Sequence, residues 1–408
     1  MVLKAFLRLL VGLLISSLAL SGLFILFELI FRFSEPHDTR GGRLDQFFFM
    51  NQRASIKNEL PYFHYYHPRL GWIMRPNSSL HYYNRGWSSV FWTDALGFRF
   101  FPSLPHFRLA QGDFLYYGTP LTEPHGRRLL MVGDSVAFGL GVHDHESFEA
   151  HLQAAVRHTP FKALGTPGWS PDQYLVAATI YVPLFRPTDL YVLLLPVNDF
   201  YPLENCTAYN MLKPIVALHP GAPPKLVFPD EMTAFRPPHE SIWWESRFLH
   251  QVGRRLEKMY LRRLCGTETP YGNLPSYRAD RARFFGEGSE ERGENERIWA
   301  RFEFLVRRFR QLAAEHTVRL VFVLLPGIDQ AWVEGQAERY GVARPNYRRF
   351  VERVRRTVEG SGAELLDPAE TFAAAERRGV VLKSQEGHPS GESNRILVRE
   401  ITARCGCR

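Results

Sequence analysis

Residues 127–148 read RRLLMVGDSVAFGLGVHDHESF, and this stretch decides how the rest of the chain is interpreted. Its apolar run, residues 129–132, has the length and composition of a short buried strand, which leads through Gly133 to Ser135. The serine therefore follows a strand end, where ligands meet the protein in an open α/β sheet. A helix is predicted to begin after Ser147, a suitable N-cap.

Four further apolar runs continue this pattern downstream. The predicted strands are residues 161–164, 189–195, 318–325 and 363–366. The predicted helices are residues 298–312, residues 347–359 and a last helix after Pro389. Strands that alternate with helices predict an α/β fold, in which a mostly parallel five-stranded sheet is covered on both faces to give three layers, α/β/α.

The N-terminus carries a candidate membrane anchor. Residues 9–27 contain no charged side chain and approach the ~20 residues that a spanning helix needs, whereas the core of a cleaved signal peptide has roughly 7–15. We therefore expect a cytoplasmic tail at residues 1–8 and an uncleaved transmembrane helix at residues 9–31, with a cleaved signal peptide as the alternative. Lys4 and Arg8 favour an inside N-terminus, so the catalytic domain is expected to be periplasmic or extracytoplasmic, anchored to the inner or plasma membrane.

Two segments interrupt or precede the predicted sheet. Residues 34–125 are rich in aromatic residues and have no long helical period, so short strands and loops are expected there. The main domain is predicted at residues 126–402, with an insertion at residues 201–293 that is first rich in proline and then basic. Loops inserted at the functional edge of a sheet commonly set specificity.

The composition limits the classes of function. The formal net charge is +8, yet no basic run is interleaved with a nucleic-acid-binding module, which argues against nucleic-acid binding. A basic surface suits anionic headgroups or acidic glycans, although a solvated surface explains it as well. The four cysteines show neither zinc-finger nor CxxC spacing, and in an exported domain Cys206 could pair with Cys265. Neither a metal nor another cofactor is expected.

Four residues follow predicted strand ends or precede the last helix, and together they supply the groups that acyl transfer needs. Ser135 can attack as a nucleophile, and His388 can accept its proton, because histidine is a suitable base near neutral pH. The backbone N–H groups of Ser135 and Gly168 and the side-chain amide of Asn198 can donate to an oxyanion. Each residue alone fits a turn, a cap or a surface position, but together they indicate catalysis.

The chain resembles the SGNH (GDSL-like) hydrolase superfamily, which is named for four such block residues. The blocks stand here as VGDSVAFGLGV, LGTPGWSPDQ, PVNDF and EGHPSGESN. The resemblance implies a flavodoxin-like fold, a catalytic serine and ester or O-acyl substrates. HPRLGWIMRPN and TDALGFR, within residues 67–99, are similar to the lead-in of membrane-anchored bacterial members, which are often linked to envelope or exported polysaccharides.

Two positions depart from the family pattern. The aspartate that usually precedes the histidine by three residues is replaced by Gln385, beside Glu386. Either residue is a candidate for orienting the imidazole, Asp367 is another, and a Ser135–His388 dyad is the remaining alternative. The third block lacks its usual glycine and has Pro196 instead, two residues before Asn198.

The leading hypothesis is a membrane-anchored serine hydrolase or O-acyltransferase. Its expected substrates are O-acyl esters, most plausibly O-acetyl groups, of an envelope or exported polysaccharide, and its expected partners are envelope or polysaccharide export proteins. A non-catalytic glycan-binding or scaffolding protein of the same fold is one alternative, supported by Gln385 in place of the acid. A lipid esterase at the membrane surface is the other.

Overall fold

The computed structural model describes the chain at residues 12, 16–17, 19–27, 64–84, 87–104, 106–108, 115–117, 126–156, 159–195, 199–208, 211–218, 221–232, 293–325, 347–385 and 388–405. The chain divides into two compact units, Met1–Arg43 with Thr233–Pro270 and Leu44–Met232 with Tyr271–Arg408. The first is described at residues 12, 16–17 and 19–27, which are helical. No helix within the described ranges is both long and apolar enough to cross a membrane, and the expected anchor at residues 9–31 lies partly outside them.

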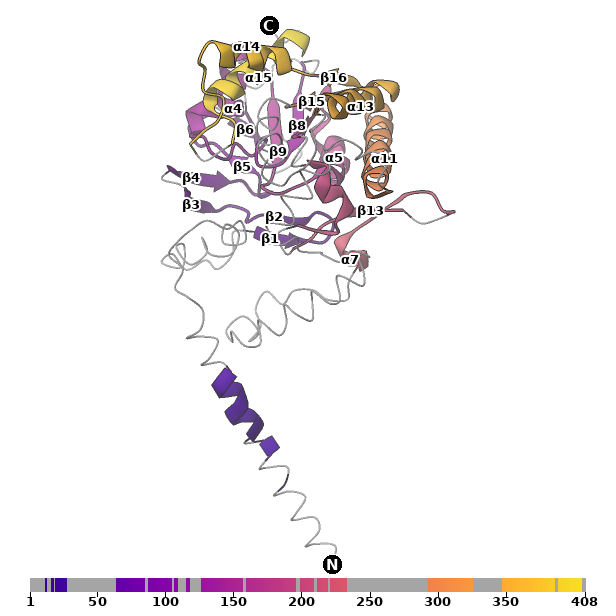
Figure 1. The fold of residues 1–408 in the computed structure, drawn as a ribbon. Helices are drawn as coiled ribbons and strands as arrows, with labels where there is room; N and C mark the ends of the chain where they lie inside the picture. The colour runs from indigo at the N-terminus through magenta and orange to yellow at the C-terminus, as the bar shows by residue number, and fades with distance from the viewer. Residues whose placement is uncertain are drawn as a thin grey trace, which may run out of the picture. The chain divides into compact units, whose positions relative to one another are not determined.

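The second unit is built on a seven-stranded sheet in the order β16-β15-β10-β8-β9-β7-β6 (Figure 1). Its strands, in chain order, are β6 (His106–Arg108), β7 (Leu115–Tyr117), β8 (Leu129–Gly133), β9 (Phe161–Gly165), β10 (Asp189–Leu194), β15 (Arg319–Leu324) and β16 (Glu364–Leu366). The last five are parallel to one another. Their order is the 2-1-3-4-5 of flavodoxin-like folds, so the predicted parallel five-stranded sheet is confirmed.

The two remaining strands of the sheet come from the aromatic-rich segment. β7 pairs with β9 and β6 pairs with β7, both antiparallel, so these two strands extend the sheet beyond β9. The segment also forms two smaller antiparallel sheets. Their strands are β1 (His64–His67), β2 (Gly71–Met74), β3 (Ser79–Asn84), β4 (Trp87–Thr93) and β5 (Arg99–Phe100).

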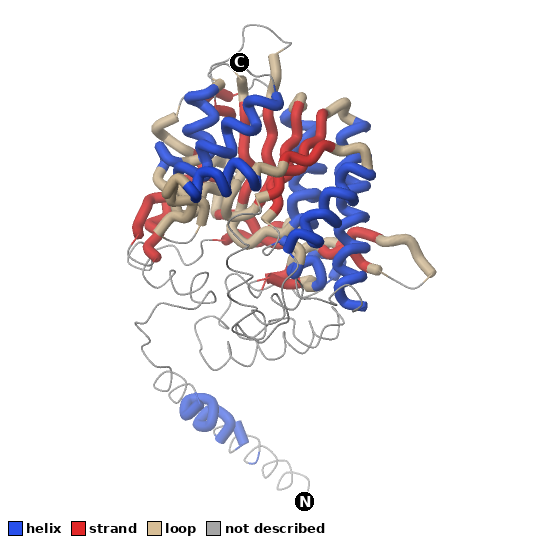
Figure 2. The backbone as a smooth tube through the Cα atoms, turned by 45° about the horizontal axis from the view of Figure 1, so that its top comes forward, coloured by secondary structure: helices blue, strands red, loops and turns tan. Residues whose placement is uncertain are grey.

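Helices cover both faces of the parallel strands, because the strand side chains alternate between two apolar clusters (Figure 2). One cluster joins Leu130, Val132 and their counterparts on neighbouring strands to α5 (Pro171–Phe185), α11 (Gly293–Glu315) and α13 (Tyr347–Gly360). The other joins Leu129, Met131 and their counterparts to α4 (Phe148–Ala155), α14 (Ala369–Arg377) and α15 (Gly391–Cys405). The three-layer α/β/α arrangement follows from these two clusters.

The described part of the insertion lies at residues 201–232. It consists of short elements: η3 (Tyr201–Glu204), β11 (Thr207–Ala208), β12 (Met211–Leu212), β13 (Ile215–Ala217), β14 (Lys225–Val227) and α7 (Pro229–Met232). The strands pair as two antiparallel hairpins, β11 with β12 and β13 with β14. A further short helix, η2 (Asp144–Glu146), precedes α4.

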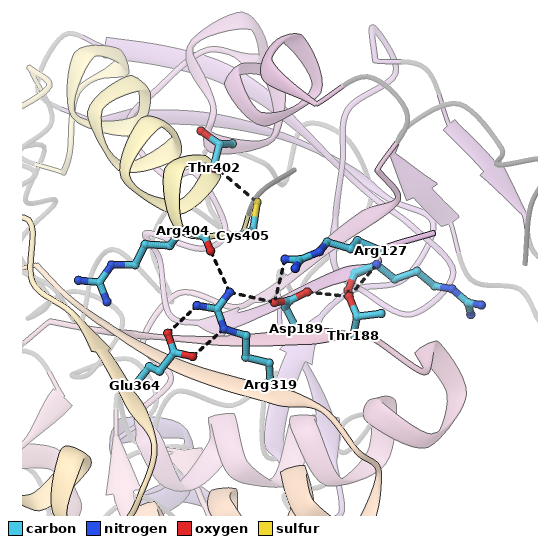
Figure 3. A network of polar contacts seen from close by, with 9 residues as sticks. Arg127, Thr188, Asp189, Arg319, Glu364, Thr402, Arg404 and Cys405 are labelled. Atoms are coloured by element: carbon cyan, nitrogen blue, oxygen red, sulfur yellow. Dashed lines mark hydrogen bonds and ion pairs between the residues drawn. The ribbon is translucent and has the colours of Figure 1, made fainter. Parts of the chain in front are cut away.

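The amino ends of three strands are joined by a charged network (Figure 3). Arg319 at the start of β15 forms two hydrogen bonds to Glu364 at the start of β16, of 2.7 and 2.5 Å. The same guanidinium lies 3.5 Å from Asp189 at the start of β10 and donates to the carbonyl of Arg404 in α15. Its hydrogen bonds to Glu364 raise the pKa of Arg319 and lower that of Glu364. This network lies at the edge of the sheet opposite Ser135, which follows the carboxyl end of β8.

Candidate active site

The structure brings Ser135 and His388 into contact across 253 residues of sequence. The Nε2 atom of His388 lies 3.0 Å from the Oγ atom of Ser135, a distance at which the hydroxyl donates to an unprotonated ring nitrogen. Ser135 is buried to 7% exposure and His388 is half-buried. A nucleophile and a base within hydrogen-bond distance are the first geometric requirement of covalent acyl transfer.

Asp134 shapes the turn that carries the serine. Its Oδ1 atom accepts a hydrogen bond of 2.9 Å from the Val136 N–H, and its Oδ2 atom lies 3.2 Å from the Ser135 hydroxyl. The hydroxyl has one proton, so it donates either to Asp134 or to the closer His388 nitrogen. Asp134 is therefore a turn residue, as its sequence position suggests, that also contacts the nucleophile.

The Ser135 turn lies directly against the end of β9, and this contact requires a glycine. A Cβ atom at Gly165 would lie 2.4 Å from the Phe138 nitrogen and 2.8 Å from the Asp134 carbonyl oxygen, so no larger residue fits without moving the backbone. Gly133 and Gly165 are paired across β8 and β9. The loops that follow these two neighbouring strands carry Ser135 and Gly168, which places both loops at the same edge of the sheet.

Gly168 lies in the turn between β9 and α5 with a φ of +82°, a conformation that side chains other than glycine rarely adopt. Among the described residues, neither the Gly168 N–H nor the Ser135 N–H donates to a protein acceptor. Unpaired backbone N–H groups at this edge are suited to receive the charge of an oxyanion. Asn198, the third expected donor, lies outside the described residues.

Asp199 shows how the loop next to Asn198 is fixed. Asp199 is fully buried, and its Oδ2 atom accepts a hydrogen bond of 2.7 Å from the Leu195 N–H. Its Oδ1 atom accepts one of 2.8 Å from the Tyr174 hydroxyl of α5. Burial raises the pKa of the Tyr174 hydroxyl well above its ordinary value, so Tyr174 stays protonated and donates. Asp199 thereby ties Leu195, which follows β10, to α5.

His388 is held in a tight loop between α14 and α15. The Ser384 N–H donates to the His388 carbonyl at 2.7 Å, and the Ser390 N–H donates to the Leu382 carbonyl at 2.9 Å. The following helix, α15, packs against the segment after the Ser135 turn: the Asn394 amide donates to the Glu146 carbonyl at 3.0 Å. The backbone on both sides of the Ser135–His388 contact is thus tied together.

The described candidates for orienting the His388 imidazole differ in their hydrogen-bond partners. Gln385 is exposed and makes no hydrogen bond to His388 or to any other described residue. Asp367 is engaged elsewhere, because its carboxylate pairs with Arg355 at 2.9 Å and accepts from the Ala369 N–H. Glu386 lies outside the described residues. The described geometry therefore supports a Ser135–His388 pair and provides no role for Gln385 or Asp367 in it.

The structure adds a buried ion pair that sequence patterns did not indicate. Lys213 of the insertion and Asp172 at the start of α5 are in contact, and both side chains are at most 1% exposed. Asp172 also accepts hydrogen bonds from the Ser170 hydroxyl at 2.7 Å and the Gln173 N–H at 2.9 Å. Burial lowers the pKa of Lys213, and the contact with Asp172 opposes that shift. The insertion thereby fixes the helix that follows the Gly168 turn.

The aromatic-rich segment fixes the same turn from another side. The Trp169 ring N–H donates to the Trp72 carbonyl at 2.8 Å, and the Gln173 amide donates to the Leu70 carbonyl at 2.8 Å. Between them, Gly71 approaches the insertion so closely that a Cβ atom would lie 2.0 Å from the Leu212 carbonyl oxygen. The motif HPRLGWIM therefore packs on the second block.

Within the described residues, no group of three or more His, Cys, Asp or Glu side chains is arranged to hold a metal ion. His143 and His145 are exposed and stack on each other, with ring centroids 6.0 Å apart.

Glu149 is a titratable group in α4, the helix that follows the Ser135 turn in sequence. Its side chain is buried in the first turn of α4, and its Oε2 atom has no hydrogen-bond partner. Burial raises the pKa of Glu149 from 4.5 to about 7, against the opposing effects of its backbone hydrogen bond, Arg99 and Lys162. Between these values the folded state binds more protons than the unfolded state, so the free energy of unfolding falls as the pH rises.

We expect Glu149→Gln to remove this pH-dependent contribution to the free energy of unfolding. At pH 8 the variant should have the higher free energy of unfolding, by up to about 3 kcal/mol, because it has no charge to bury. At pH 4 the difference should be smaller, since the wild-type carboxyl is then protonated in both states. Urea unfolding at the two pH values measures this, and an equal difference at both would contradict the prediction.

No protein-family model and no curated protein matches the chain. Solved structures similar to it include a member of the lipolytic protein G-D-S-L family from Veillonella parvula, 11% identical, with 68% of this chain and 97% of that chain covered and a TM-score of 0.36. Another is a catalytic mutant of an acetylxylan esterase from Geobacillus stearothermophilus, 13% identical, with 70% and 97% covered and a TM-score of 0.32. These scores are low, so the activity is inferred from the chain's own geometry.

Proposed function

We propose that this chain is a membrane-anchored serine esterase or O-acyltransferase of the SGNH type. Its substrates would be O-acyl esters, in particular O-acetyl groups, of an envelope or exported polysaccharide. The observation that carries the proposal is the 3.0 Å contact between His388 Nε2 and Ser135 Oγ at the carboxyl edge of a parallel sheet. A contact between residues this far apart in sequence, at the edge where ligands bind, is an arrangement that catalysis explains directly.

The chemistry follows from the pair. His388 takes the Ser135 proton through Nε2 while Oγ attacks the acyl carbon, and the developing oxyanion accepts hydrogen bonds from the Ser135 and Gly168 N–H groups. The alkoxide leaving group, a sugar hydroxyl, then receives the proton from His388. Water or a second sugar hydroxyl, deprotonated by His388, then attacks the acyl carbon of the acyl-serine. The acyl–Oγ bond breaks, His388 returns the proton to Oγ, and free acid or a new ester leaves.

Three features support an extracytoplasmic, membrane-bound location. The described part of residues 9–31 is helical, and its apolar side chains Leu20, Leu23 and Leu26 are more than half exposed, as a lipid-facing helix requires. Lys4 and Arg8 precede it. Cys206 and Cys405 are both disulfide-bonded, which is typical of proteins in oxidising compartments.

A panel of esters tests the proposed substrate class. The full chain in detergent should release acetate from an O-acetylated polysaccharide and should hydrolyse short acyl esters at least 10-fold faster than long-chain ones. The reverse preference would favour a lipid esterase. Glycan binding with no turnover and no acyl-serine would favour the non-catalytic alternative, for which the exposed side chain of Gln385 is the supporting observation.

A further inference from the structure

The guanidinium of Arg99 holds the loop that carries Ser135, although Arg99 belongs to the aromatic-rich segment. Its Nη1 atom donates to two successive carbonyls of that loop, those of Phe138, at 3.3 Å, and Gly139. Its Nη2 atom donates to Asp144 at 3.0 Å, just beyond the loop. The Arg99 side chain is 2% exposed, so its bonds to the two carbonyls form away from water.

Aromatic rings fix the guanidinium in place. It lies 4.3 Å from the centroid of the Phe91 ring, 4.5 Å from that of Phe101 and 5.5 Å from that of Phe138. Each ring face attracts the cation, and together the rings leave the guanidinium little freedom to rotate. A planar fork of donors can hold two neighbouring carbonyls at once, which an ammonium group on a flexible chain does poorly.

The carbonyls that Arg99 holds belong to the turn that fixes the nucleophile. The Phe138 N–H donates to the Asp134 carbonyl at 3.0 Å, and the Leu140 N–H donates to the Ser135 carbonyl at 2.9 Å. A shift of residues 138–139 would therefore move the backbone on both sides of Ser135. Displacements of about 1 Å in reacting groups can lower a rate by about 10²-fold.

The β4–β5 hairpin, which carries Arg99, is anchored to the sheet by a second charged pair. Asp94, five residues before Arg99, contacts Lys162 of β9 at 2.6 Å, and both side chains are at most 1% exposed. The Asp94 carboxylate also accepts from the Leu96 and Phe98 N–H groups, at 2.9 and 3.0 Å. The motif TDALGFR is thus attached to β9 at its start and to the nucleophile loop at its end.

From these contacts we infer that Arg99 is a positioning residue for the nucleophile: it sets the backbone of the Ser135 loop and so the alignment of Ser135 with His388. The inference rests on the proposed function for its kinetic consequence, but the effect on the loop itself is independent of any activity. It also assigns a role to the segment before β8, which becomes part of the active-site structure.

Arg99→Lys tests the inference, because lysine keeps the charge and loses the fork. We expect kcat for a short acyl ester to fall at least 10-fold with KM within about twofold of wild type, and amide hydrogen exchange at residues 138–140 to accelerate. Asp144→Asn, which removes the negative charge that faces the guanidinium and leaves the carbonyl bonds, should lower kcat about threefold and accelerate the same amides less. Arg319→Lys is the matched control at the opposite edge of the sheet, and it should change neither quantity by more than about twofold.

The outcomes separate the inference from the proposed function. Unchanged exchange at residues 138–140 in both Arg99→Lys and Asp144→Asn would overturn the inference, whatever the activity. An Arg99→Lys variant that folds, with kcat within twofold of the Arg319→Lys control, would overturn it as well. If Arg99→Lys does not fold, Asp144→Asn decides the question by its exchange rates alone. Accelerated exchange in a protein whose wild type lacks esterase activity would contradict the proposed function and leave the loop contact established.

Discussion

Replacing Ser135 by alanine is expected to lower kcat/KM for O-acetyl esters by about 10³-fold or more, because no acyl-enzyme can then form. The substitution removes one hydroxyl from a turn whose backbone is held by Asp134 and Gly165, so the melting temperature should stay within about 2 °C of wild type. Ester hydrolysis followed at several substrate concentrations, with thermal unfolding of the same sample, measures both quantities.

His388→Ala is the companion variant. Removal of a general base commonly lowers the rate by about 10²–10⁴-fold, so its loss should approach that of Ser135→Ala. The double variant should be no slower than the worse single variant, because the two residues act in one step. Gln385→Ala is the control, since its side chain is exposed and makes no hydrogen bond to a described residue, and its activity should stay within about twofold of wild type. Turnover retained in a folded Ser135→Ala protein would contradict the mechanism.

Lys213→Met is expected to lower the free energy of unfolding by about 3 kcal/mol or more, the largest stability effect predicted for this chain. The substitution leaves the Asp172 carboxylate buried without its cation, and breaking a buried pair commonly costs about 3–5 kcal/mol. Urea unfolding under non-reducing conditions measures the effect. Adding Asp172→Asn should restore part of the loss, because the stranded charge is then gone.

A second lysine of the insertion provides the control. Lys225 pairs with Glu231 at 3.5 Å, but its side chain is 71% exposed, and exposed pairs contribute little. Lys225→Met should therefore change the free energy of unfolding by no more than about 0.5 kcal/mol. Equal effects of Lys213→Met and Lys225→Met would show that the buried pair does not stabilise the second block.

The parallel strands could be predicted because each is a continuous apolar run, the pattern of a strand buried on both faces. Residues 189–195 and 318–325 were predicted as strands, and the structure has Asp189–Leu194 and Arg319–Leu324. The N-cap of α4 was predicted at Ser147, whose hydroxyl accepts from the Ala150 N–H at 3.0 Å. Local signals of this kind lie within a few residues of the element that they specify.

Among the described helices that pack on the parallel sheet, α5 and α14 were not predicted. α5 is buried on nearly every side, so it shows no amphipathic period, although Ser170, Pro171 and Gln173 form a capping box with proline in the first turn that could have located its start. α14 is short, with nine residues, and follows the β16 strand closely. The addition of β6 and β7 to the sheet was not predicted either, because pairing between strands that are distant in sequence has no local pattern.

The candidate site could be predicted only in part, because only some of its residues lie next to a local sequence signal. Ser135, Gly168 and His388 could be located because each follows a strand or precedes a helix within a recognisable block. Arg99, Lys213 and Asp94 could not, because the contacts that matter here, to the Phe138 carbonyl, Asp172 and Lys162, each join residues 39 or more positions apart, and nothing near them in sequence indicates these contacts. The expected orienting role of Gln385 depended on a hydrogen bond to His388, and among the described contacts Gln385 is exposed and makes none.

Fluorophosphonate labelling of the full chain in detergent, with the adduct located by mass spectrometry, tests the central claim most directly. We predict a single adduct on Ser135, absent in Ser135→Ala and formed at least 10-fold more slowly in His388→Ala, because the imidazole accepts the serine proton during attack. A folded protein that forms no adduct, or one labelled at Ser135 at the same rate without His388, would contradict an activated serine nucleophile.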